Sequence, residues 1–244
     1  MSRSNRPDDA ILALDASTAA ASVAVLRAGV VVAERTAAMR GADEERLMPA
    51  VAAALDDAGV PAGALAAIVC GGGPGSFTSL RIAGAIAKGL ATVWDCALVA
   101  APSLALAAAS TAPHDGRWLV TLDAMRGERY AALVTLEASG HAPRVVGYDF
   151  LGVHGGDAVD GLVATHHARG VLDANAATAT ARGVAGFALA LDERRVGDAA
   201  ALALAPVDLA LWEPDYGRKA EAQVKWEAQH GRALPADAVG ALLP

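Results

Sequence analysis

Two segments of the chain end an apolar run with an aspartate and continue with polar residues. Asp15 ends "ILALD" and precedes Ser17 and Thr18, whereas Asp123 ends "WLVTLD" and precedes the turn "AMRGE". A carboxylate at the end of a strand, with hydroxyl and backbone N–H groups beside it, can hold a magnesium ion and contact nucleotide phosphates. The alternative interpretation is that each aspartate only caps its own turn.

The glycine-rich segment "GGGPGSFTS", residues 71–79, is a second candidate for phosphate binding. Glycines ahead of a helix let the backbone approach an anion at the helix N-terminus. A Walker loop, however, needs Gly-Lys-Ser/Thr where this chain has Ser-Phe-Thr-Ser, and a Rossmann loop needs a third glycine that this segment lacks. We therefore predict a structural turn between a strand and a helix, made by Gly73, Pro74, Gly75 and Ser76.

The histidines and cysteines match no common metal or nucleophile motif. The six histidines include no H-E-x-x-H and no H-x-x-x-H, Cys70 and Cys96 lie in apolar runs, and no G-x-S-x-G is present. The sequence thus predicts neither a metal site nor a catalytic residue.

Apolar periodicity predicts the elements that must position these groups. Short runs bounded by turn residues indicate strands, and apolar residues at three- and four-residue spacing indicate helices. The expected elements are strands at 11–17, 22–29, 30–39, 65–70 and 96–101 and helices at 44–58 and 78–91. Pro49 must lie in the first turn of the first helix or kink it, and Ser76 or Thr78 can cap the second.

The chain also contains a repeated pattern. Asp15 precedes Val23 by eight positions, and Asp123 precedes Ala131 by the same number. This suggests a duplicated α/β domain with a crevice between its halves, unless two common hairpins merely coincide. We expect strand-helix-strand structure over residues 152–200. The predicted division is a loose tail at 1–9, lobes at 10–105 and 106–218, and a polar, helical C-terminal tail at 219–244.

The predicted helix at 78–91 is apolar or small on nearly all sides. Ala83, Gly84, Ala87 and Ala91 recur at helical spacing among larger apolar residues. Such a helix is buried on more than one side, either within its own domain or against a helix of another chain. The pattern alone favours the first arrangement.

Composition bounds the function. The 244 residues carry a formal net charge of −7, so the summed field of the chain repels nucleic acid and favours contact with it through a partner. No apolar run reaches the ~20 residues that cross a bilayer, and the first ten residues lack the order of a signal peptide. We expect a cytoplasmic protein.

Four motifs resemble one family. "GGPGSFTSLRIAGAIAKGLA" is similar to the GPGSFTGLRIG and AKGLA signature of the TsaB (YeaZ) family, within the TsaD/glycoprotease M22-like superfamily. "ILALDAST", "LDAMRGERY" and "PDYGR" resemble its opening strand, its D-A-R-x-G-E-x-Y element and its terminal P-x-Y-x-R. The resemblance implies an actin-like, Hsp70-like (ribonuclease H-like) fold with two duplicated lobes and mixed sheets.

The resemblance also implies a role. Proteins of this family are non-catalytic partners of the catalytic subunit TsaD and act with the ATPase TsaE to place threonylcarbamoyl on the adenosine next to the tRNA anticodon. It implies contact with tRNA only through the complex, a homodimer in isolation, no membrane, and no required cofactor beyond ATP or ADP with Mg²⁺ at the complex. The alternative function is a nucleotide-dependent phosphotransferase or ATPase of the same fold, which would use Asp15 and Asp123.

The resemblance further implies that the two first-lobe helices form the partner face. The residues expected there are Leu47, Val51, Leu55, Leu80, Arg81, Ala83, Gly84, Ala87 and Lys88. Three positions depart from the family pattern: Ser79 replaces a usual Gly, Asp43 and Glu44 replace His-Ser, and Met125 replaces an Arg. The first two departures are expected to affect the choice of partner. The third makes anion binding by the second lobe less favourable, because an arginine is absent.

Overall fold

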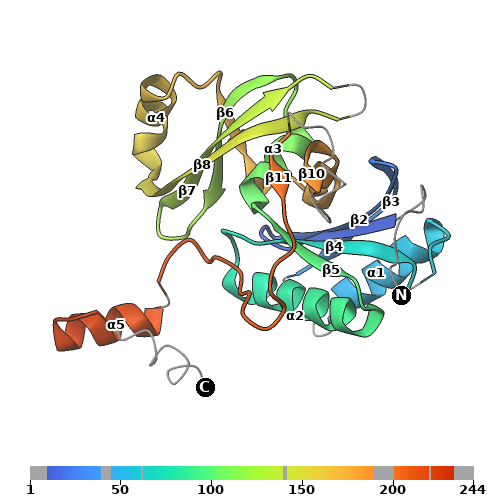
Figure 1. The fold of residues 1–244 in the computed structure, drawn as a ribbon. Coiled ribbons are helices and arrows are strands. Elements are labelled where there is room, and N and C mark those ends of the chain that lie inside the picture. The colour runs from blue at the N-terminus through green and yellow to red at the C-terminus, as the bar shows by residue number, and fades with distance from the viewer. Residues whose placement is uncertain are drawn as a thin grey trace.

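The computed structural model describes residues 10–39, 45–61, 63–139, 142–189, 201–219 and 221–233. The tail predicted at 1–9 and the departure at 43 and 44 lie outside these ranges. Two large β-sheets, a small two-stranded sheet and the associated helices make up the described part of the molecule, and the two large sheets lie one above the other in Figure 1.

The first sheet contains five strands in the order β3-β2-β1-β4-β5. Strands β1, β2 and β3 form an antiparallel meander, whereas β4 and β5 run parallel to β1. Every strand predicted in this half is present, with ends shifted by a few residues at most. Their bounds are β1 Ala10–Asp15, β2 Ala20–Arg27, β3 Val30–Ala38, β4 Leu65–Gly71 and β5 Ala97–Ala101.

Two helices cover one face of this sheet (Figure 1). Helix α1, Leu47–Asp57, begins where the Glu45 carboxylate accepts hydrogen bonds from the first backbone N–H groups, and it holds Pro49 in its first turn. Helix α2, Phe77–Trp94, extends three residues beyond the prediction and ends at Asp95, which is left-handed at φ 49°. Ser76 is the N-cap residue of α2, although its side chain makes no capping hydrogen bond to the helix backbone.

The second sheet repeats the topology of the first. Its order is β8-β7-β6-β9, with an antiparallel meander β6-β7-β8 and with β9 parallel to β6. This is the order β3-β2-β1-β4 over again, so the predicted duplication and the mixed-sheet α/β fold class are confirmed. The elements are β6 Gly116–Asp123, β7 Glu128–Glu137, β8 Arg144–Gly155, α4 Val159–Thr165 and β9 Val171–Asp173, with short 3₁₀ turns η1 Gly156–Ala158 and η2 Ala174–Ala176.

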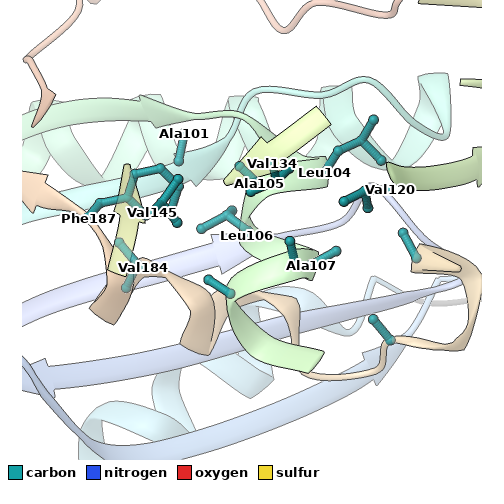
Figure 2. Close-up of a cluster of buried hydrophobic side chains, with 14 of the residues drawn as sticks. Ala101, Leu104, Ala105, Leu106, Ala107, Val120, Val134, Val145, Val184 and Phe187 are labelled. Carbon is teal, nitrogen blue, oxygen red and sulfur yellow. The ribbon is translucent and has the colours of Figure 1, made fainter. Parts of the chain in front are cut away.

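A helix between the two sheets fills the space where the sequence predicted a crevice. All residues of α3 (Ser103–Thr111) from 103 to 109 are buried. Figure 2 shows Leu104 and Leu106 of this helix in one apolar cluster with Val134 of the second sheet and Val184 of η3 (Thr180–Gly186). The same cluster includes Val69 and Val99 of the first sheet, so the two lobes share a continuous core. The predicted open crevice is thus wrong over this region, because apolar side chains from both lobes close it.

The chain then returns from the second lobe to the first. After β10 (Ala188–Leu189) and β11 (Ala203–Leu204), residues 205–218 run back along β5 and over α2 in Figure 1. We call residues 205–218 the C-terminal strap. Val207 N–H donates to Leu98 O, and Asp215 N–H donates to Gly72 O. The prediction placed this segment wholly in the second lobe, whereas it is shared by both. Helix α5, Glu221–His230, follows it.

Candidate functional site

Asp15 lies at the centre of a buried polar cluster. Its side chain has no exposed surface, and its carboxylate accepts hydrogen bonds from three hydroxyl groups. Ser17 Oγ lies 2.8 Å and Thr180 Oγ1 2.6 Å from Oδ2, and Ser103 Oγ lies 2.7 Å from Oδ1. These donors come from the turn after β1, from η3 and from the start of α3, so the cluster joins three parts of the chain.

Burial governs the electrostatics of this cluster. Desolvation raises the pKa of Asp15 above its ordinary value, and the hydrogen bonds from Thr180, Ser103 and Ser17 oppose that rise. Cys70, beside it on β4, has its thiol pKa raised by burial and by the Asp15 charge. The carboxylate is therefore enclosed and already hydrogen-bonded, which does not fit direct contact with a magnesium ion or a nucleotide phosphate in this arrangement of the lobes.

The other residues predicted around the two turns take local roles. Thr18 Oγ1 donates to the carbonyl of Ala20 within its own turn. Asp123 is exposed, and its carboxylate accepts from the backbone N–H of Met125 at 2.8 Å. Its own N–H lies 3.4 Å from Asn175 Oδ1. Within the described residues, Asp123 thus belongs to a hydrogen-bond network separate from that of Asp15, and it caps its turn as the alternative interpretation stated.

The glycine-rich turn uses its backbone donors within the protein. The N–H of Gly72 donates to Ala101 O, that of Gly73 to Ser103 Oγ, and that of Ser76 to Ser17 O. Close packing explains the glycines: a Cβ at Gly73 would overlap the carbonyl of Asp215, and one at Gly75 would lie 2.5 Å from the carbonyl of Ser17. Pro74, between them, is buried. The segment is a packed turn between β4 and α2, and these N–H groups are not available to a phosphate.

Most residues predicted for the partner face are buried within their own lobe. Seven of them pack against the first sheet or beneath the C-terminal strap, namely Leu47, Val51, Leu55, Leu80, Ala83, Gly84 and Ala87. That part of the prediction is wrong, because the apolar side of each helix is used by its own sheet. Ser79 is also buried and donates to Ser76 Oγ, so this departure from the family pattern lies inside the lobe.

The C-terminal strap covers a further part of α2. A Cβ at Gly84 would lie 3.3 Å from Pro214 and 3.5 Å from Trp212. Lys88 Nζ lies 3.8 Å from Glu213 and 6.0 Å from the centroid of the Trp212 ring. Lys88, which was predicted to face another chain, thus lies beside an acidic residue of its own chain. The prediction failed here because the two segments are far apart in the sequence.

The exposed sides of the two helices carry different residues from those predicted. The exposed residues of α2 are Phe77, Thr78, Arg81, Ala85, Gly89, Thr92 and Val93, and those of α1 are Met48, Pro49, Ala52, Asp56 and Asp57. We call each set the exposed stripe of its helix. Among the residues of the predicted face only Arg81 is exposed, and its guanidinium lies 4.7 Å from the centroid of the Phe77 ring. The phase of the apolar periodicity could have separated this outer stripe from the buried one.

The described ranges lack two further kinds of feature. In these parts of the chain, no group of three or more His, Cys, Asp or Glu side chains is placed to hold a metal ion. The helices that the structure describes include none that is both long and apolar enough to span a membrane.

Comparison with known proteins gives consistent likenesses in sequence. The model of the family described as "TsaD: tRNA N6-adenosine threonylcarbamoyltransferase" matches residues 31–147. The tRNA threonylcarbamoyladenosine biosynthesis protein TsaB of Bacillus subtilis is 37% identical over 123 residues, which are 50% of this chain and 54% of that protein. The protein of the same name from Escherichia coli is 36% identical over 124 residues, 50% of this chain and 53% of that one. The chain spans about half the length of the curated relatives it matches.

Solved structures extend the likeness to the whole fold. A Pseudomonas aeruginosa protein described as similar to peptidase YEAZ superimposes with a TM-score of 0.63 at 24% identity, over 86% of this chain and 100% of that one. YeaZ from Pseudomonas aeruginosa does so with a TM-score of 0.54 at 25% identity, over 73% and 90%. The strand order and these likenesses define a two-lobed α/β protein of the duplicated, ribonuclease H-like and actin-like fold class. Within that class, the chain is similar to proteins of the TsaB/YeaZ family over about half of its length.

Proposed function

We propose that this chain is a TsaB-type subunit in the synthesis of threonylcarbamoyladenosine in tRNA. In this role it is a non-catalytic scaffold or activator that pairs with a TsaD-like catalytic subunit and works with a TsaE-like ATPase. The observation that carries the proposal is its identity of 35–37% to curated proteins named for this biosynthesis. We further propose that the protein is cytoplasmic, forms a homodimer in isolation and meets tRNA only through the complex. A net charge of −7 supports this indirect contact with tRNA.

The buried state of Asp15 supports a non-catalytic role. A general base or a metal ligand must reach the substrate or the ion, whereas this carboxylate is enclosed and hydrogen-bonded to three hydroxyl groups. We therefore propose that the isolated chain requires no cofactor, and that ATP or ADP with Mg²⁺ acts at the complex.

The exposed stripes of α1 and α2 are the proposed contact with the catalytic subunit. They lie on the helix pair that the family resemblance implicates, and they combine small residues on α2 with Arg81 and Phe77 at one end. Small side chains allow a partner helix to approach closely, and an arginine beside an aromatic ring is a common composition of binding hot spots.

Two tryptophan variants, one on α2 and one on α4, test this face. Ala85→Trp adds an indole to the exposed stripe, and we expect pull-down of the TsaD-like subunit to weaken about tenfold or more, since a change at a hot spot costs ~2 kcal/mol. The matched control is Ala164→Trp, at an exposed alanine of α4 in the second lobe, which should leave binding unchanged. Ala83→Trp is unsuitable because Ala83 is fully buried and the indole would disrupt the fold.

The biosynthetic role is tested separately, in cells depleted of their own TsaB. Expression of this chain should restore the threonylcarbamoyladenosine content of tRNA, measured by mass spectrometry of nucleosides. Ala164→Trp should restore it equally and Ala85→Trp should not. Restoration by Ala85→Trp would place the contact elsewhere, whereas failure of the unmodified chain would contradict the proposed role. If the isolated chain hydrolyses ATP and Asp15→Asn abolishes this hydrolysis, the phosphotransferase or ATPase alternative is favoured instead.

A further inference from the structure

The polar cluster around Asp15 is a directed chain of hydrogen bonds between the two lobes. Ala181 N–H donates to Ser22 Oγ at 2.8 Å, and Ser22 Oγ lies 3.0 Å from Thr180 Oγ1. Since Ser22 Oγ accepts from the amide, its proton is free to point to Thr180, whose proton in turn points to Asp15. One arm of the chain therefore runs from η3 through a residue of β2 and back to η3 before it reaches the carboxylate.

A second arm reaches the same carboxylate from the glycine-rich turn. Gly73 N–H donates to Ser103 Oγ at 3.0 Å, and Ser103 Oγ donates to Asp15 Oδ1 at 2.7 Å. Each arm begins at a backbone N–H, which can only donate, so the protons of both arms point toward Asp15. A carboxylate accepts at both oxygens, and it is the one group in the cluster that ends both arms. Gly71, next to it on β4, leaves no room for a Cβ, which would overlap Oδ1.

Apolar packing alone would not fix how the lobes are oriented. The core between them is built largely from alanine, valine and leucine, and such contacts are non-directional. Hydrogen bonds to a buried charge depend strongly on distance and direction, and a buried donor left without its acceptor is costly. The Asp15 cluster therefore selects one arrangement of η3 against β1 and β2.

We propose that Asp15, Thr180 and Ser22 form a latch that holds the second lobe closed against the first. While the latch is made, Asp15 is sealed from solvent and the glycine-rich turn is tied to the lobe junction through Ser103. Release of Thr180 opens η3 from β1 and β2 and exposes the carboxylate, while the Ser103 arm keeps Asp15 connected to the glycine-rich turn. The inference does not depend on the proposed function, because it concerns the closed state of the chain alone.

Two variants that remove equivalent bonds test the latch. Thr180→Val and Ser17→Ala each delete one hydroxyl bond to the same oxygen of Asp15, at 2.6 Å and 2.8 Å, but only Thr180 belongs to η3. In hydrogen–deuterium exchange of the full chain, we expect Thr180→Val to speed exchange about tenfold in the peptide covering residues 180–186, and Ser17→Ala to leave it unchanged. Small-angle X-ray scattering should show a larger radius of gyration for Thr180→Val alone.

Further variants separate the hydroxyl from its surroundings. Thr180→Ser keeps the hydroxyl and should stay closed, so fast exchange in this variant would assign the contact to the methyl group and overturn the latch. Equal exchange in Thr180→Val and Ser17→Ala would overturn it as well. If Thr180→Val does not fold, Ser22→Ala takes its place, since it cuts the same arm without touching Asp15. Unchanged exchange at 180–186 in Ser22→Ala would then refute the proposal.

Discussion

The two lobes use one motif in two different ways. Asp15 and Asp123 each end the first strand of a duplicated sheet, and each is followed by a turn and an antiparallel partner strand. Asp15 is fully buried and accepts from three hydroxyl groups, whereas Asp123 is exposed and accepts from the backbone of its own turn. The comparison teaches that a strand-end aspartate acquires its role from the segments packed against it, here α3 and η3.

The largest expected effect comes from filling the space beside Asp15. Gly71→Ala places a methyl group on the carboxylate and should lower the free energy of unfolding by about 3 kcal/mol or more, because it combines overpacking with loss of buried hydrogen bonds. Gly72→Ala is the control, since its Cβ would meet its nearest atom at an ordinary 3.5 Å. Urea unfolding measures the free energy of unfolding of both variants. Equal values would show that the space beside Asp15 is not as closely packed as the structure indicates.

Removal of each aspartate tests the difference directly. Asp15→Ala leaves three buried hydroxyl groups without their acceptor and should cost about 3 kcal/mol, at ~1 kcal/mol or more for each lost partner. Asp123→Ala removes one exposed turn cap and should cost about 1 kcal/mol or less. Thermal and urea unfolding of the two proteins provide the measurement. Similar losses would show that burial does not distinguish the sites.

The pH dependence of stability should also differ between the sites. The pKa of Asp15 is raised on folding, so the folded state binds its proton more tightly than the unfolded state does. The wild-type protein should therefore lose free energy of unfolding relative to Asp15→Asn as the pH rises from the unfolded pKa, about 4, through the raised folded pKa. Unfolding at a series of pH values measures this difference. If the wild-type protein instead becomes more stable relative to Asp15→Asn as the pH rises through this range, the predicted direction is wrong.

The smallest effect is expected in the turn after Asp123. Met125 is exposed and adopts a left-handed conformation at φ 68°, which a residue with a Cβ occupies at some cost. Met125→Gly should raise the free energy of unfolding by up to about 1 kcal/mol. The equivalent glycine at Ser17, whose hydroxyl binds Asp15, should lower it. Urea unfolding measures both changes in the free energy of unfolding. Changes of opposite sign would support the contrast between the two turns, whereas a decrease in both variants would contradict it.

Much of the fold follows from local pattern. The strands of the first sheet, both of its helices and the duplicated hairpins were predictable because each depends on apolar spacing and turn residues within a short window. The sequence placed the partner face on helices α1 and α2, but most of the residues it selected lie on their buried sides. Apolar periodicity identifies the side of a helix that is buried, and in a single lobe that side belongs to its own sheet.

The strap shows the limit of such reasoning for surfaces. Lys88 and Gly84 were expected to meet another chain, and they meet Glu213, Trp212 and Pro214 of the strap instead. Because these contacts join positions more than 120 apart in sequence, no local pattern around α2 indicates them. The same holds for Gly73, whose neighbour is the carbonyl of Asp215.

The sequence by itself determined the order and type of the elements, the repeated strand-Asp-turn-strand unit and the family motifs, since each of these depends on residues that are close together in the chain. Only the tertiary structure decided that Asp15 is enclosed while Asp123 is open. Two of the donors that enclose Asp15, Ser103 and Thr180, are 88 and 165 residues away from it in the chain. Their arrival depends on how α3 and η3 pack between the sheets, and that packing is a property of the whole fold.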